Sequence, residues 1–188
     1  WNETPHETSW IKLLRRSLDA AGFQKTGIVG TDDGGDPGWK IVKQISEDPE
    51  LRAAVARVGY HYPRFESPVS ARNCGCPLWS SEDGPWRGDW TGAEQIARVL
   101  NRNYVVGKYV KTEIWSPVTS YYDSLPPPGS GVMRANEPWT GHYEVQPAVW
   151  AVAHTTQFAK PGWRYLDSAC VTIDGGSVVA LESPDRKD

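Results

Sequence analysis

The sequence predicts an α/β fold, the C-terminal half of a (β/α)8 TIM barrel followed by the start of a β-sandwich. Strand-like runs alternate with helical stretches, a pattern that implies parallel strands with helices outside them. After about residue 160 the helices stop and only strand-like segments remain. A complete barrel needs about 250 residues, so a chain of 188 residues can hold only part of one. We therefore predict a partial barrel domain at 1–160 and the beginning of a sandwich domain at 161–188.

The first elements are a helix and a strand. The helix should begin at Thr8 or Ser9 and close at Gly22, because apolar residues recur between them at helical spacing; these are Ile11, Leu14, Leu18 and Ala21. Residues 26–31 form a short apolar run typical of a strand. The loop at 32–38 is rich in aspartate and glycine but lacks the spacing of a calcium or phosphate loop. It is interpreted as a rim loop, with Asp32 as a polar wall of a pocket.

Helical periodicity returns at 39–45 and 50–58, and Pro49 suits the first turn of the second stretch. Residues 58–63 resemble another strand end, halted by Pro63. His61 lies at this end, where a histidine can act as a general base, a metal ligand or a hydrogen-bonded wall residue. The last of these is the commoner role for a histidine standing alone.

The strand at 78–83 is an apolar, aromatic run that ends on the carboxylate of Glu82. A helix follows, with a face of Ile96, Val99, Leu100 and Tyr104 and an end at Gly107. Residues 109–115 alternate with period two, as a strand does. If Trp1-Asn2-Glu3 ends the fourth barrel strand, the strands ending near Thr31, His61, Ser81 and Trp115 are the fifth to eighth. Glu82 then belongs to the seventh strand.

A long connection at 116–146 contains three consecutive prolines and exceeds the usual length of such loops. The last helix is predicted at 147–158, with an apolar face of Val149, Trp150, Val152 and Ala153. Strands are expected at 163–166 and 176–181, separated by a turn at 174–176. Because no helix lies between them, they suggest the start of a different, all-β module.

Composition narrows the functional classes. A net charge of −3 and a pI near 5.8 argue against a nucleic-acid partner, which selects a basic surface. No apolar run approaches the roughly 20 residues of a transmembrane segment. The start resembles neither a signal peptide nor an initiator methionine, so an internal piece of a longer protein is expected. Ten tryptophans and eight tyrosines against three phenylalanines suit sugar rings, although packing alone explains many of them.

The three cysteines are too few for a disulfide scaffold and poorly spaced for zinc. Cys74 and Cys76 could form a metal or redox pair. Ordinary loop thiols, or a thiol that pairs outside this chain, are the simpler interpretations, and Cys170 has no evident role. We expect neither a metal nor another cofactor.

Glu3 and Glu82 each follow a tryptophan and a small polar residue at a predicted strand end. Two carboxylates at the carboxyl ends of barrel strands are the working groups of many glycosidases. Retention of configuration requires a carboxyl separation of about 5 to 5.5 Å, against roughly 6.5 to 9.5 Å for inversion. Alternatively, each glutamate is a solvated or salt-bridged strand-end residue. Asn2-Glu3-Thr4 also fits a glycosylation sequon, and a glycan on Asn2 would block such a pocket.

The chain resembles glycoside hydrolase family 59 along nearly its whole length. Six motifs fall in the order seen in that family. These motifs are Trp1-Asn2-Glu3, His61-Tyr62-Pro63, the 78–83 segment, Ser120-Tyr121-Tyr122, the 137–143 segment and the 154–158 segment. The resemblance implies that Glu3 is the general acid/base and Glu82 the nucleophile. It further implies that Asn2 binds the galactose and that Trp115 shapes its pocket, and we add Tyr62 as a substrate-binding candidate.

By the same resemblance, the substrate would be galactosylceramide or a related galactosyl sphingolipid. It would be degraded in the lysosome, with a saposin-type protein presenting the lipid. The chain departs from the family pattern at Ser116, where an asparagine is expected, at Gln95, where a cysteine is expected, and in the triple proline. A non-catalytic carbohydrate- or glycolipid-binding protein, or a related β-glycosidase for another sugar, remains the alternative.

Overall fold

The computed structural model describes residues 8–63, 65–114, 117–119, 131–135 and 137–187. The chain divides into two compact units. The first comprises Trp1–Glu82 with Gly107–Thr112, and the second comprises Asp83–Val106 with Glu113–Asp188. Among the described residues, no helix is both long and apolar enough to cross a membrane. The division at residue 160 into barrel and sandwich remains a prediction.

The first unit is built around a sheet whose neighbouring strands follow in the order β1-β2-β3-β4. Its elements are α1 (Ser9–Ala20), β1 (Val29–Asp33), α2 (Gly35–Gly38), α3 (Lys40–Glu47), α4 (Pro49–Ala54), β2 (Arg57–His61), α5 (Val69–Arg72), β3 (Leu78–Asp83) and β4 (Tyr109–Ile114). The pairs β1–β2 and β2–β3 are parallel. The predicted α/β pattern with a sequentially ordered parallel sheet is therefore confirmed.

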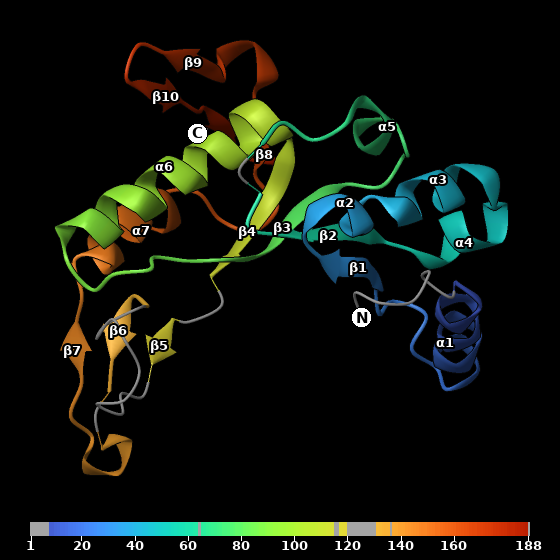
Figure 1. Ribbon diagram of the computed structural model, residues 1–188, viewed down its shortest axis with the longest axis horizontal. Helices are drawn as coiled ribbons and strands as arrows, with labels where there is room; N and C mark the ends of the chain where they lie inside the picture. Colours follow the sequence, from blue (N-terminus) through green and yellow to red (C-terminus); the bar gives the residue numbers. More distant parts are fainter. Residues whose placement is uncertain (1–7, 64, 115–116, 120–130, 136, 188) are drawn as a thin grey trace. The chain divides into compact units, whose positions relative to one another are not determined.

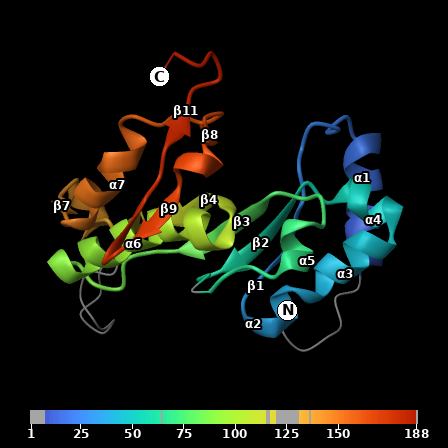
Figure 2. The same cartoon turned by 90° about the horizontal axis from the view of Figure 1, so that it is seen from above.

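One face of this sheet packs against the helices of the first unit. Helices α3 to α5 gather beside β1 and β2 in both views (Figure 1, Figure 2). The core between them is apolar and almost fully buried; it includes Ile41, Val42, Ile45, Leu51, Val55, Val58, Ala71, Leu78 and Tyr109. Side chains alternate between the faces of a strand, so the residues between these core positions point to the opposite face of the sheet.

Trp79 lies on that opposite face. Its neighbours on β3 are Leu78, which belongs to the helix-covered core, and Ser80, which is buried. The Nζ atom of Lys111 lies 4.2 Å from the centroid of the Trp79 ring, and the guanidinium carbon of Arg57 lies 5.7 Å from it. Both distances suit cation–π attraction. A polar and aromatic lining therefore covers the side of the sheet that the helices leave open.

Irregularities in strand pairing occur near the carboxyl ends of β1 and β3. Thr31 pairs with Gly59 but Asp33 pairs with Tyr60, so Asp32 is an extra residue in β1. In the same way, Ser81 is an extra residue in β3, between the partners of Tyr60 and His61. A β-bulge bends the strand and re-aims the side chains around it.

The second unit contains two long helices and several short strands. Its elements are α6 (Trp90–Gly107), β5 (Val118–Thr119), β6 (Met133–Arg134), the 3-10 helix η1 (Pro138–Thr140), β7 (Glu144–Val145), α7 (Ala148–Thr156), β8 (Arg164–Tyr165), the 3-10 helix η2 (Asp167–Ala169), β9 (Val171–Ile173), β10 (Gly176–Val178) and β11 (Leu181–Glu182). Residues of α6 and α7 share an apolar core with Val132. Strands β8 and β11 pair antiparallel, as do β9 and β10.

Several predicted boundaries were wrong. The helix expected at 50–58 ends at Ala54, and β2 begins at Arg57, because fully buried Val58 completes the sheet core rather than a helix face. Strand β1 lies about two residues later than expected. The sequence also gave no sign of α5 or β9. Trp150 was assigned to the apolar face of α7, but it is 58% exposed.

Candidate active site

Glu82 lies at the carboxyl end of β3, with a third of its side chain exposed. The flanking residues explain why this side chain reaches the rim. Ser80 is fully buried, and Asp83 is buried with its Oδ1 atom accepting a hydrogen bond from the Gly84 amide at 3.0 Å. Since the bulge at Ser81 reverses the alternation, Asp83 turns inward as a structural carboxylate and Glu82 stays accessible at the strand end.

Tyr62 follows β2 and contacts Glu82 twice. Its hydroxyl donates a hydrogen bond to Glu82 Oε1, and its backbone amide donates to the Glu82 carbonyl oxygen at 2.8 Å. The second bond continues the pairing of β2 with β3 by one residue. Tyr62 was predicted to bind substrate; the structure places its hydroxyl on the candidate nucleophile, and direct contact with a sugar stays a prediction.

His61, on β2, lies between a carboxylate on β1 and another on β3. Its Nε2 atom is 2.9 Å from Asp32 Oδ1, and its Nδ1 atom is 3.4 Å from Glu82 Oε2. Three-quarters of the His61 side chain is buried, whereas 57% of the Asp32 side chain is exposed. A hydrogen bond therefore joins the predicted polar wall residue to the strand-end histidine, and this histidine is within ion-pair distance of Glu82.

The backbone around this group adopts an uncommon conformation. Thr31, Asp32 and Tyr62 have φ angles of +73°, +55° and +47°, in the left-handed region that residues other than glycine seldom occupy. For a β-branched residue such as Thr31 the conformation is a true outlier. Such residues gather at functional sites, where the surrounding structure compensates for the strain.

Three of the predicted site residues, Asn2, Glu3 and Trp115, lie outside the described residues. The separation of the Glu3 and Glu82 carboxyl groups is therefore still a prediction. The sequence identified Glu82 and Tyr62 but not the pairing of Asp32 with His61. A signal was present, because both residues end consecutive strands of a parallel sheet, and such ends meet at one edge.

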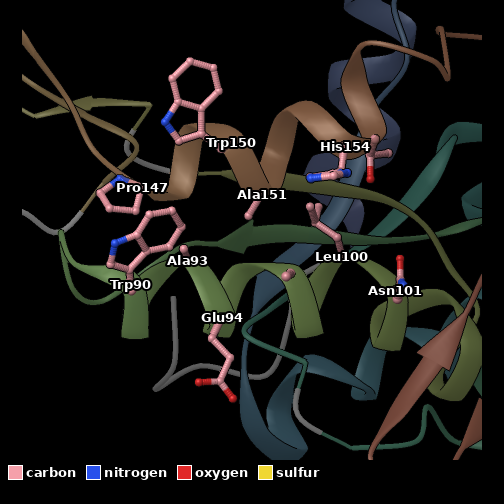
Figure 3. A pocket seen from close by; sticks show the side chains of 11 residues that line it. Trp90, Ala93, Glu94, Leu100, Asn101, Pro147, Trp150, Ala151 and His154 are labelled. Carbon is pink, nitrogen blue, oxygen red and sulfur yellow. The ribbon is translucent and has the colours of Figure 1, made fainter.

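A groove elsewhere in the structure lacks this chemistry. A hollow of about 410 Å³ lies between α6 and α7 in the second unit. The rings of Trp90 and Trp150 border one end of it, His154 lies toward the other, and the Glu94 carboxylate points away (Figure 3). It contains no carboxylate pair, so it is not the candidate active site.

No cluster of three or more histidine, cysteine, aspartate or glutamate side chains suited to a metal ion occurs in the part of the chain that the structure describes. Cys74 and Cys76 are free thiols in the connection between α5 and β3, as the interpretation as loop thiols expected, and both are buried in the core of the first unit. A hydrogen bond from the Cys76 thiol lowers the pKa of Cys74 to about 6 and raises that of Cys76.

The sequence of this chain is similar to those of known proteins. The sequence profile of glycosyl hydrolase family 59 matches residues 1–157. Galactocerebrosidase from Danio rerio is 45% identical over 187 residues, which cover 100% of this chain and 27% of that protein. Galactocerebrosidase from Homo sapiens is 41% identical over 182 residues, covering 96% of this chain and 26% of that protein. The chain thus spans about a quarter of the length of these relatives.

Solved structures share the fold at low sequence identity. SrfJ from Salmonella typhimurium aligns with a TM-score of 0.74 at 14% identity, over 96% of this chain and 43% of that one. A glycoside hydrolase family 30 subfamily 8 xylanase from Clostridium acetobutylicum aligns with a TM-score of 0.66 at 16% identity, over 94% of this chain and 41% of that one. The fold therefore matches under half of a larger glycosidase structure.

Proposed function

Because the chain belongs to glycosyl hydrolase family 59, we propose that it forms part of a retaining glycosidase that removes β-linked galactose from galactosylceramide and related galactosyl sphingolipids. The observation that supports this most directly is the pair of contacts on the Glu82 carboxylate, from Tyr62 on Oε1 and from His61 on Oε2. A nucleophilic carboxylate must be ionised and oriented, and hydrogen bonds to the charged form favour ionisation.

In the first step, a Glu82 oxygen attacks the anomeric carbon of the galactose and forms a glycosyl ester. The bond to the ceramide oxygen breaks, and Glu3 donates a proton to that oxygen. In the second step, Glu3 removes a proton from water, whose oxygen attacks the anomeric carbon and releases Glu82 as a carboxylate. Two inversions give net retention, which requires the two carboxyl groups to lie about 5 to 5.5 Å apart.

Tyr62 supports this cycle through its hydroxyl. Hydrogen bonds to charged groups are shorter and stronger than those between neutral groups, so the Tyr62 bond holds the anion best before attack and after hydrolysis. When Glu82 carries the sugar, its negative charge is gone and the hydroxyl can turn to the sugar's ring oxygen. Asn2 and Trp115 would contact the galactose from the two ends of the half-barrel.

We assign β1 to β4 as the fifth to eighth strands of a barrel, with Glu3 at the end of the fourth. The sequential order of the sheet and the match to 41% of a larger glycoside hydrolase family 30 xylanase chain support this assignment. The antiparallel strands β8 to β11 would begin the β-sandwich from residue 161, with residues 1–160 as the partial catalytic domain.

The lipid substrate follows from the relatives named galactocerebrosidase. A ceramide tail is insoluble in water, so a saposin-type protein that presents the lipid is the expected partner, and the lysosome the expected compartment. Donor and acceptor side chains suffice for every step of the displacement, so the proposed mechanism calls for no cofactor.

The test is trapping of the galactosyl ester on the full-length protein. A 2-deoxy-2-fluoro-β-galactosyl fluoride lacks the 2-hydroxyl, which slows both steps of the reaction. Its fluoride leaving group keeps the first step faster than the second, so the ester accumulates. Mass spectrometry should then find one fluorogalactosyl adduct, on the peptide that contains Glu82.

Turnover provides the matching control. Release of galactose from galactosylceramide should fall to background in Glu82→Gln, and glucosylceramide should be a poorer substrate than galactosylceramide. An adduct on another residue, or equal turnover by Glu82→Gln, would exclude Glu82 as the nucleophile. Binding of galactosylceramide without any turnover would instead indicate a glycolipid-binding protein.

A further inference from the structure

We propose that Asp32 is a positioning residue of this site, acting through His61 to hold the Glu82 carboxylate in the orientation that attack requires. This inference rests on the proposed function and adds a residue to its machinery. Asp32 does not touch Glu82 in the contacts described above; the imidazole of His61 lies between them, 2.9 Å from one carboxylate and 3.4 Å from the other.

The number of N–H groups on the His61 ring decides which contacts the ring can make. A neutral imidazole carries one N–H and can donate to only one of two acceptors, whereas the protonated ring donates from both nitrogens. Both nitrogens of His61 face carboxylate oxygens. A ring with donors on both nitrogens satisfies both contacts, and the Asp32 carboxylate fixes the rotation of the ring that faces Glu82.

The groups that face His61 come from three strands. Asp32 approaches from β1 and Glu82 from β3, while Tyr62 follows His61 on β2 with its ring centroid 5.9 Å away, edge-on. Together with the Tyr62 hydroxyl, His61 restrains both oxygens of the Glu82 carboxylate. Loss of Asp32 would remove the contact that fixes the rotation of the His61 ring.

The backbone of β1 supplies an independent argument. Asp32 is the extra residue of the bulge and has a φ of +55°, so the strand adopts an unfavourable conformation that turns this carboxylate toward His61. Aspartate and asparagine tolerate the left-handed region better than most residues. Asp32→Asn should therefore keep the backbone and remove only the charge.

A merely structural role makes a different prediction. The Asp32 side chain is 57% exposed, and exposed ion pairs contribute little to stability. If Asp32 only stabilised the backbone around it, its replacement would affect the unfolding temperature slightly and leave kcat/KM unchanged. A positioning role instead lowers kcat/KM while stability stays near that of the wild type.

The experiment uses the full-length protein and a dinitrophenyl β-galactoside, whose leaving group needs no proton, so that the first step reports on Glu82 rather than on Glu3. In Asp32→Asn, kcat/KM should fall roughly tenfold, as for loss of one hydrogen bond to a charged group. The unfolding temperature of Asp32→Asn should stay near that of the wild type, because the side chain is exposed. Asp36→Asn, at an exposed aspartate of the short helix α2 that follows β1, is the matched control and should match the wild type.

A double-mutant cycle then tests the route through His61. Residues that act as a unit are not additive, so Asp32→Asn should cause little further loss in a His61→Gln background. An unchanged kcat/KM in Asp32→Asn, or losses that multiply in the double variant, would overturn the proposal. If Asp32→Asn fails to fold, Asp32→Gly, which also accepts a positive φ, replaces it, and failure of both shows a structural role. Loss of the adduct at Glu82 would contradict the proposed function instead.

Discussion

At the scale of single residues, the two oxygens of Glu82 have different neighbours. Oε1 accepts from the Tyr62 hydroxyl, and Oε2 faces His61. Tyr62 is held in place by its backbone bond to the Glu82 carbonyl oxygen, so the hydroxyl and the carboxylate belong to one rigid strand pair. A bond of this kind supports catalysis because its geometry exists before the substrate binds.

Replacing Tyr62 with phenylalanine should remove this donor and leave the ring. A hydrogen bond to a charged group is worth about 1.5 to 3 kcal/mol, which corresponds to a fall in kcat/KM of roughly tenfold to a hundredfold. Steady-state hydrolysis of an aryl β-galactoside by the full-length protein measures the loss. Tyr143→Phe, at a tyrosine that is 62% exposed, should leave the rate unchanged, and an unchanged rate in Tyr62→Phe would show that its hydroxyl is dispensable.

At the scale of elements, the open face of the sheet depends on Gly59. A Cβ atom added there would lie 2.7 Å from Ser81 Oγ and 2.9 Å from Val29 Cγ1. The absence of a side chain at Gly59 on β2 thus leaves room for the side chains of Ser81 on β3 and Val29 on β1. The position of Glu82, one residue after that bulge, depends on this close approach.

Gly59→Ala should destabilise the protein, since the β-branched Val29 cannot move aside as the Ser81 hydroxyl can. Overpacking of this kind costs about 1 to 3 kcal/mol, and the midpoint of urea unfolding should fall accordingly. Gly34→Ala offers a control, because a Cβ there meets nothing closer than 3.6 Å. Equal midpoints for the two variants would show that the sheet has room at Gly59.

The helix α4 carries a second testable contact. Asp48 caps it by accepting a hydrogen bond from the Leu51 amide at 3.0 Å, and Lys12 of α1 contacts the same carboxylate at 2.8 Å. The Lys12 hydrogen bond is the main cause that lowers the pKa of Asp48 below its usual range. Because the pKa of Asp48 is lower in the folded state than in the unfolded state, its charged carboxylate stabilises the fold. This stabilisation is complete above the pKa of the unfolded state and is lost as the pH falls through the pKa of the folded state.

Asp48→Ala should therefore lower the melting temperature at neutral pH, and the difference from the wild type should narrow below about pH 4, where free aspartate protonates. Thermal unfolding followed by circular dichroism over a range of pH provides the measurement. A difference that stays constant down to the acidic end of the range would show that the carboxylate charge is irrelevant to the cap.

At the scale of the whole molecule, large apolar side chains are exposed in both compact units. Trp10 of the first unit and Trp90 of the second are each 73% exposed, and Phe158 is 67% exposed. Exposed aromatic side chains add apolar surface to which a dye or a second chain can bind. The chain spans only 26–27% of the length of the relatives named galactocerebrosidase.

The 188-residue chain produced alone should consequently release no galactose from galactosylceramide and should enhance the fluorescence of a dye that binds apolar surface. An open parallel sheet with an uncovered edge is also prone to associate, so size-exclusion chromatography should show oligomers. A monomeric chain that neither binds the dye nor aggregates would show that the two units cover their own apolar surface.

The sequence predicted much of the sheet because local patterns specify it. The run from Leu78 to Asp83 becomes β3 as expected, and the periodic face of Ile96 and Tyr104 becomes the buried side of α6. The errors fall where burial competes with periodicity, as at Val58, which fits a helical pattern but completes the sheet core. Trp150 illustrates the opposite case, because its size suggested burial and the helix turns it outward.

By itself, the sequence determined the family, the alternation of strands and helices, and the placement of a glutamate at a strand end, because these depend on the order and spacing of side chains along the chain. Only the tertiary structure brought Asp32, His61 and Glu82 together. Their contact depends on two bulges that alter strand register, and register is decided by packing between strands that are far apart in sequence.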